Sequence, residues 1–139
     1  MEQVTDYRKL EIDDSDLDGE LNRQAAMYLH VAEQAVNAEV NYELFKGQLK
    51  QLEAQLDAAI RAQAAADKRK VTEAAITKEI ERHPDHVKAV ATLIGLRGKK
   101  EGFRAVRESW HMRKDLLIQR CINERSDIDL AKPMTYNEK

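Results

Sequence analysis

The stretch that decides the fold covers residues 17–63 and reads LDGELNRQAAMYLHVAEQAVNAEVNYELFKGQLKQLEAQLDAAIRAQ. Its apolar and small residues recur at alternating steps of three and four, the spacing that places side chains on one face of a helix. No proline interrupts the stretch, and only Gly19 and Gly47 weaken it. The positions on this face are Leu17, Leu21, Gln24, Tyr28, Val31, Ala35, Ala38, Tyr42, Phe45, Leu49, Leu52, Leu56, Ala59 and Gln63.

This pattern predicts a single helix roughly 70 Å long, at about 1.5 Å per residue. A chain of 139 residues cannot cover a seam of that length by folding into a ball, so the seam needs partner helices. These helices come from the same chain, from other copies of it, or from both. We therefore expect an all-α protein that assembles as a homo-oligomer.

The composition agrees with a helical protein. Charged residues make up 35% of the chain and aromatic residues only 5%, which is typical of long helices and coiled coils. The lone Cys121 excludes an internal disulfide and fits a reducing compartment. The sequence has no apolar run of membrane-spanning length and no signal peptide, so we expect a soluble, cytoplasmic protein with no membrane partner.

The remaining sequence divides into two further helices and two irregular ends. We expect a flexible acidic arm over residues 1–13, one helical domain over residues 14–125 and an irregular tail over residues 126–139. Ser15 and Asp18 resemble a capping pair for the first long helix, which we place at about residues 14–66. The last long helix is expected at about residues 85–125, so that the two form a helical hairpin.

A basic linker and a short helix are predicted between the long helices. Asp67, Lys68, Arg69 and Lys70 form a polar segment with no apolar residue. Thr72 is a suitable N-cap for the short helix, with Ala75, Ile76 and Ile80 on one face. Pro84 disfavours helical geometry at His83, so the short helix should end there.

Small residues form a stripe along the last predicted helix. Three interior glycines cost roughly 0.5–1 kcal/mol each relative to alanine, so they call for an explanation. One reading is close approach of another helix backbone, and the other is that Gly95 and Gly98 break the helix. The stripe consists of Ala91, Gly95, Gly98, Gly102, Ala105 and Ser109.

Two short motifs resemble metal sites but lack the residues that would complete them. Residues 14–19 match the opening of an EF-hand calcium loop, yet Ala25 stands where the bidentate glutamate should be. Residues 83–86 read HPDH, without a second group of ligands at usable spacing. An acidic helix start and a turn between helices explain these motifs better, and we expect no metal or cofactor.

The sequence gives no case for catalysis. It has no nucleophile with a matching base, no glycine-rich phosphate loop and no paired carboxylates on a predicted concave surface. We therefore expect a protein that is not an enzyme.

Basic residues are concentrated in the second half of the chain, whereas acids dominate residues 1–45. Long solvated helices are often rich in lysine and arginine, so a charged surface alone has a structural explanation. Basic clusters repeated around an oligomer would nevertheless bind phosphates in a salt-sensitive, sequence-independent way. The candidate nucleic-acid-binding residues are Arg61, Lys68, Arg69, Lys70, Arg97, Lys99, Lys100, Arg104 and Arg107.

The order of these elements resembles the UvsY-like family of phage recombination mediators. The resemblance covers roughly residues 14–125. It rests on the long helix ending in Arg61-Ala62-Gln63, the basic linker at residues 67–70, and Thr72-Glu73-Ala74-Ala75-Ile76. It also rests on Glu101-Gly102-Phe103-Arg104-Ala105-Val106, which precedes a basic, amphipathic helix end.

The resemblance implies a small, all-helical, ring-forming protein, with seven subunits in the T-even phage member. It implies binding to single-stranded DNA and loading of a RecA-like recombinase onto strands coated by a single-strand-binding protein, in the host cytoplasm if the chain is phage-encoded. Basic residues at the end of the first long helix bind DNA in that family. Arg61, and with it Lys68, Arg69 and Lys70, match those positions here.

Two other functions remain open from the residues alone. The chain could be a structural or interaction module, such as a phage assembly or inhibitor protein, whose helical seam binds another protein. It could also be a calcium-responsive adaptor acting through residues 14–19. Salt-dependent binding to single-stranded oligonucleotides would distinguish a recombination mediator from these two other functions.

Overall fold

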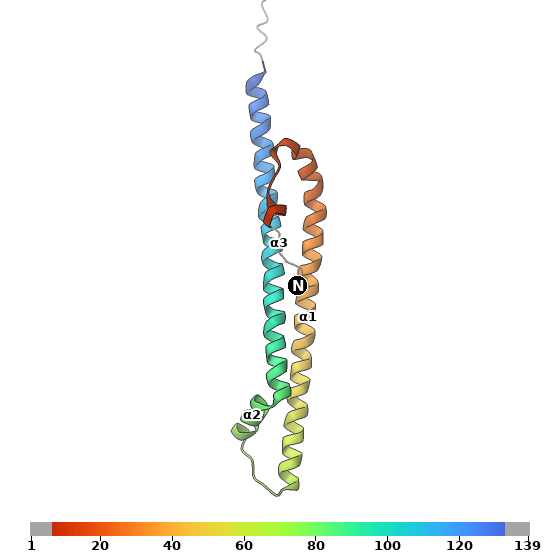
Figure 1. Ribbon diagram of the computed structural model, residues 1–139, viewed down its shortest axis with the longest axis vertical. Coiled ribbons are helices and arrows are strands. Elements are labelled where there is room, and N and C mark those ends of the chain that lie inside the picture. Colours follow the sequence, from red (N-terminus) through yellow and green to blue (C-terminus); the bar gives the residue numbers. More distant parts are fainter. Residues whose placement is uncertain (1–6, 133–139) are drawn as a thin grey trace, which may run out of the picture. The chain divides into compact units, whose positions relative to one another are not determined.

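The computed structural model describes residues 7–132 and confirms the all-α fold. Two short 3-10 turns, η1 (Tyr7–Leu10) and η2 (Asp14–Asp16), precede the long helix α1 (Leu17–Ala66). A short helix, α2 (Glu73–Arg82), and a second long helix, α3 (Pro84–Ala131), complete the chain (Figure 1). The helix α1 has 50 residues and α3 has 48. None of these described helices combines the length and the apolar character needed to cross a membrane.

Contacts within the chain gather into two units. The terminal unit joins residues up to 34 with residues from 103 on, and the central unit consists of residues 35–102. In each unit a stretch of α1 packs antiparallel against a stretch of α3. In the terminal unit the Gln24 amide donates to the carbonyl of Trp110. In the central unit His86 Nε2 lies 3.0 Å from Glu53 Oε1.

The buried face of α1 follows the predicted seam in the middle and leaves it at both ends. Near its start, Glu20 is buried whereas Leu21 is 41% exposed. Near its end, Ala64 is buried whereas Gln63 is exposed. Tyr28 and Ala59, also predicted to face inward, are exposed as well. A helix of 3.6 residues per turn drifts by about 20° per heptad against a strict 3.5-residue repeat, so a single straight face cannot hold over this length.

The cap at the start of α1 differs from the prediction. Asp13 caps η2, because its carboxylate accepts from the backbone N–H of Ser15 (3.0 Å) and from the Ser15 hydroxyl (2.6 Å). Asp16 then accepts from the backbone N–H of Gly19 (3.2 Å). The predicted Ser15–Asp18 pair was wrong, since Ser15 lies inside η2 and donates to Asp13 instead.

The short helix α2 agrees with its sequence signals. The Thr72 side chain accepts from the backbone N–H of Ala75 (3.1 Å), which confirms the predicted N-cap. Ile76 is buried and His83 is the extended C-cap, directly before Pro84. Ala75 is exposed, so it does not belong to the predicted buried face.

The ends of the chain are more ordered than expected. The helix α3 continues to Ala131, past the predicted end near residue 125, because nothing before Pro133 interrupts the helix. Residues 7–10 of the expected arm form η1. The other parts of the arm and tail, residues 1–6 and 133–139, lie outside the described residues, and the assignment of one domain stays a prediction.

The reading that Gly95 and Gly98 break the helix was wrong, and close approach of a helix from another copy stays a prediction. The helix α3 runs through its glycines without a break. A Cβ atom built at Gly95, Gly98 or Gly102 would meet nothing within 4 Å, so these glycines pack against no other part of the described chain. Residues with high helix propensity, such as Leu96 and Lys99, carry the helix through this region.

Candidate nucleic-acid interface

The basic linker begins with a helix-ending turn centred on Lys68. The backbone N–H of Arg69 donates to the carbonyl of Ala64 (2.9 Å), and that of Lys68 donates to the carbonyl of Ala65 (3.2 Å). These two bonds define a Schellman motif, whose central residue is usually glycine because it takes a positive φ. Lys68 occupies that position with φ of 53°. The turn therefore holds a basic side chain in an unfavourable backbone conformation.

The three basic linker residues are exposed and carry uncompensated charge. Lys68, Arg69 and Lys70 all lie on the surface of the central unit. Within residues 7–132, no carboxylate forms an ion pair with any of them. Their neighbour Asp67 accepts instead from the side-chain amide of Gln63 (3.1 Å). The linker thus offers three adjacent cations that could bind phosphate groups.

Arg61 is in a different electrostatic environment from the linker. Its Nη2 donates to Glu73 Oε2 (2.7 Å) on α2, and its Nε donates to Asp57 Oδ2 (3.1 Å) one turn earlier on α1. Glu73 first, and then Asp57, raise the pKa of the Arg61 guanidinium, so this group stays protonated. Two carboxylates already compensate its charge. Arg61 therefore joins α1 to α2, and its predicted contact with DNA would require it to leave these partners.

Two basic residues of α3 in the central unit lie over an aromatic ring. Lys100 Nζ is 4.5 Å from the ring centroid of buried Tyr42, and the Arg97 guanidinium carbon is 6.0 Å from the same centroid. A cation–π contact of this kind holds a side chain close to the protein surface. Lys99 is exposed and has no such contact in the described residues.

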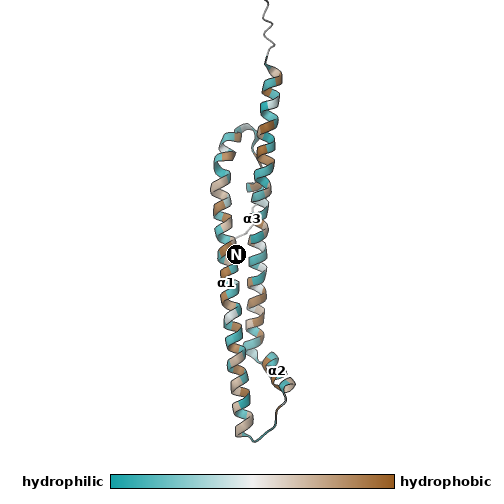
Figure 2. Ribbon diagram, turned by 180° about the vertical axis from the view of Figure 1, so that it is seen from behind, coloured by the Kyte–Doolittle hydropathy of each residue, from teal (hydrophilic) through white to brown (hydrophobic). Residues whose placement is uncertain are grey.

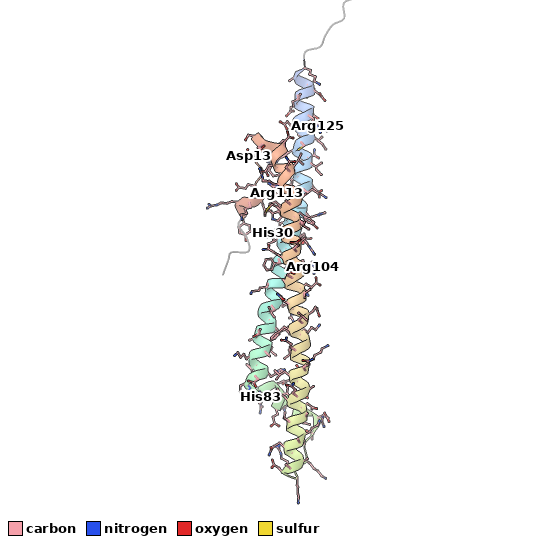
Figure 3. The ribbon with its side chains drawn as sticks, turned by 90° about the vertical axis from the view of Figure 1, so that its right-hand side faces the viewer. Asp13, His30, His83, Arg104, Arg113 and Arg125 are labelled. Atoms are coloured by element: carbon pink, nitrogen blue, oxygen red, sulfur yellow. The ribbon has the colours of Figure 1, made fainter. Side chains whose placement is uncertain are left out.

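Arg104, labelled in Figure 3, and Arg107 belong to the part of α3 that lies in the terminal unit. Arg104 is exposed and Arg107 is half-buried. No ion pair involves either of them among the residues that the structure describes. The candidate residues are therefore divided between the two units, and the linker is the place where three of them are adjacent.

A buried polar network in the terminal unit was missed by the sequence reasoning. Arg113 of α3 is only 5% exposed, and it donates to the Glu20 carboxylate and to Gln24 Oε1 (2.8 Å). It also donates to the carbonyls of Leu10 (3.0 Å) and Glu11 (3.0 Å). Figure 3 shows Arg113 beside the N-terminal segment. The charge pattern places Arg113 in a basic stretch, whereas its charge is used inside the fold.

This network fixes the segment that precedes α1. Arg120, which also lies on α3, donates to Asp14 Oδ1 (2.9 Å) and so holds the same segment. The signal that could have revealed the network was the glutamine Gln24 and the arginine Arg113 at inward positions of otherwise apolar helix faces, whereas Glu20 lies outside the predicted face. Charged residues are rarely buried unless they are paired, so such positions indicate partners.

Neither metal-like motif has a metal-binding arrangement in the part of the chain that the structure describes. No group of three His, Cys, Asp or Glu side chains is placed to hold an ion there. Asp13 and Asp16 accept from backbone N–H groups, and Asp14 pairs with Arg120. The acids of residues 13–16 therefore act at the helix start.

Comparison with known proteins adds no family to this description. No protein family, curated protein or solved structure matches the chain.

Proposed function

We propose that the chain is a non-enzymatic protein that binds single-stranded DNA and acts as a recombination mediator. The observation that carries this proposal is the linker of Lys68, Arg69 and Lys70, with three exposed cations and no paired carboxylate. Cations of this kind bind the sugar–phosphate backbone and read no base sequence. The resemblance to UvsY-like proteins supports the mediator part of the proposal.

The mechanism would be electrostatic and geometric. Several copies in one assembly would present several linkers, and a strand crossing them would make many phosphate contacts at once. The strand would be drawn away from a single-strand-binding protein and passed to a RecA-like recombinase. Arg104 and Arg107 are two further candidate residues without an ion pair among the described residues, and they could extend the contact.

DNA binding is tested with two triple variants that remove the same charge. In Lys68→Ala/Arg69→Ala/Lys70→Ala the linker loses its three cations. In Lys46→Ala/Lys50→Ala/Lys78→Ala three exposed lysines of the same unit are removed instead. The affinity for oligo-dT and for a mixed-sequence strand is measured by fluorescence anisotropy at several salt concentrations.

We expect the linker variant to bind both strands more weakly and to flatten the plot of log affinity against log salt. Removing one phosphate interaction lowers the steepness of this plot by about 0.7 on single strands. The control variant should change both quantities less. Equal weakening in the two variants would mean that net charge alone governs binding, and absence of wild-type binding at low salt would end the DNA-binding proposal.

The mediator role needs a separate assay. A RecA-like recombinase hydrolyses ATP slowly on strands coated by a single-strand-binding protein, and a mediator should restore the rate. We expect the wild type to restore it and the linker variant not to do so. If the wild type binds DNA but does not restore the rate of ATP hydrolysis, the protein binds DNA and is not a mediator.

A structural or interaction module remains the alternative function, and a specific observation favours it. Large apolar side chains lie exposed on both long helices, including Leu44 (63%), Ile94 (59%) and Leu116 (60%). Contiguous exposed apolar residues are typical of protein–protein contact, and Val36, Val40 and Leu44 follow each other in this way along α1.

A further inference from the structure

Two exposed faces of the central unit are complementary in charge. The first face lies on α1, where Val36, Val40 and Leu44 follow each other at steps of four residues, beside Glu39 and Glu43. The three apolar residues are 50%, 49% and 63% exposed. Between residues 35 and 45, α1 carries these two acids and no base. We call this the acidic face.

The second face lies on α3. Val87 and Ile94 are 55% and 59% exposed, and their spacing of seven residues places them on one side of the helix. Lys88 and Lys99, eleven residues apart, lie beside them and are also exposed. Between residues 87 and 100, α3 carries bases and no acid. We call this the basic face. In Figure 2, apolar (brown) and polar (teal) residues alternate along both long helices.

The four charged residues that define the faces have no ion-pair partner within residues 7–132. Among the described residues, no ion pair involves Glu39, Glu43, Lys88 or Lys99. Both faces are exposed although they belong to the same unit, so they do not cover each other within one copy. Opposite charges on separate surfaces of one chain favour contact between copies.

We propose that the acidic face of one copy of this chain binds the basic face of a second copy. Val36, Val40 and Leu44 of one copy would pack beside Val87 and Ile94 of the next, with Glu39 and Glu43 near Lys88 and Lys99. The open space beside Gly95 and Gly98 allows the second helix to come close. The contact joins two different surfaces, so it is heterologous and each copy keeps one face of each kind.

A heterologous contact produces a closed ring, or a growing assembly if the rotation between copies does not close. This inference deepens the assembly part of the proposed function and does not depend on DNA binding. Its test is molar mass in solution, and the test of the proposed function is affinity for DNA, so the two can fail separately.

The experiment uses two charge-reversal variants. In Glu39→Lys/Glu43→Lys both faces become basic, and in Lys88→Glu/Lys99→Glu both become acidic. Each variant alone should therefore have a smaller molar mass than the wild type by light scattering. An equimolar mixture should form larger assemblies than either variant alone, because the two altered faces attract each other and the two unaltered faces do so as well. Circular dichroism checks that each variant remains helical.

Two further variants complete the test. The quadruple variant that carries both reversals should assemble alone, as the wild type does. Leu44→Gln should weaken assembly, whereas Leu116→Gln, a change of similar exposure (60%) outside both faces, should not. A monomeric wild type, unchanged assembly of either charge-reversal variant, or a mixture with no larger mass than the separate variants would overturn the proposal.

Discussion

Arg113 of α3 and Glu20 of α1 form a buried ion pair although they stand 93 residues apart in the sequence. The Arg113 guanidinium also holds the carbonyls of Leu10 and Glu11, so one side chain connects three segments of the terminal unit. Removing one partner of a buried pair leaves an uncompensated charge, which is far more costly than removing an exposed pair.

We expect Arg113→Met to lower the free energy of unfolding by about 3 kcal/mol. The measurement is urea denaturation followed by circular dichroism. The double variant Glu20→Gln/Arg113→Met should be destabilised by less than the sum of the two single variants, because no charge is then left unpaired. Additive effects would show that the two side chains are not energetically coupled.

Stability should depend on pH through Glu20. Hydrogen bonding from Arg23, and then from Arg113, lowers the pKa of the Glu20 carboxyl below its ordinary value of 4.5. A depressed pKa stabilises the fold above the unfolded-state value, and this contribution is lost as pH falls through the folded-state value. Thermal unfolding between pH 3 and pH 7 measures it.

The matched variant for the pH experiment is Glu20→Gln. We expect its melting temperature to fall less steeply below about pH 4.5 than that of the wild type. Asp13, whose pKa is lowered by hydrogen bonds from the Ser15 hydroxyl and backbone N–H, remains in both proteins and accounts for part of the residual slope. Parallel pH profiles would contradict the role of Glu20.

Lys68→Gly should raise the stability of the chain by about 0.5–1 kcal/mol, because glycine adopts a positive φ without a Cβ clash. Lys68→Ala removes the same charge but keeps the Cβ, so it should give no such gain. The two variants should bind DNA equally weakly if the ammonium group binds phosphate. Different DNA affinities would indicate that the shape of the turn matters more than the charge.

Two glycine substitutions should have opposite effects. Gly98→Ala should raise stability by about 0.5–1 kcal/mol, since its Cβ would meet nothing within 4 Å in the described part of the chain. Gly19→Ala should lower it, because its Cβ would clash with the Asp16 carboxylate that caps the helix start. Chemical denaturation in the Glu39→Lys/Glu43→Lys background excludes effects from contact between copies.

The sequence predicted the elements better than their surfaces. Strict apolar spacing, Thr72 and Pro84 each act locally, and the long helices, the short helix and its cap agree with the structure. Which residues of a helix are buried depends on the partner helix. For that reason Glu20 is buried, whereas Leu21, the predicted inward residue, is exposed. Charge counting likewise identified the linker cations but not the carboxylates that Arg61 and Arg113 meet across the fold.

The pairing of Arg61 with Asp57 and Glu73 limits what this residue can add to the binding of a polyanion. A phosphate that reaches Arg61 would displace a fixed carboxylate and release no dissolved ion, so it would gain little of the entropy that would favour the proposed linker contacts. The displaced Glu73 would stay in the first turn of α2 and repel the strand. Arg61 and its two acids thus carry a net negative charge beside the three linker cations, and in the proposed complex they would mark where along the chain a strand stops being attracted.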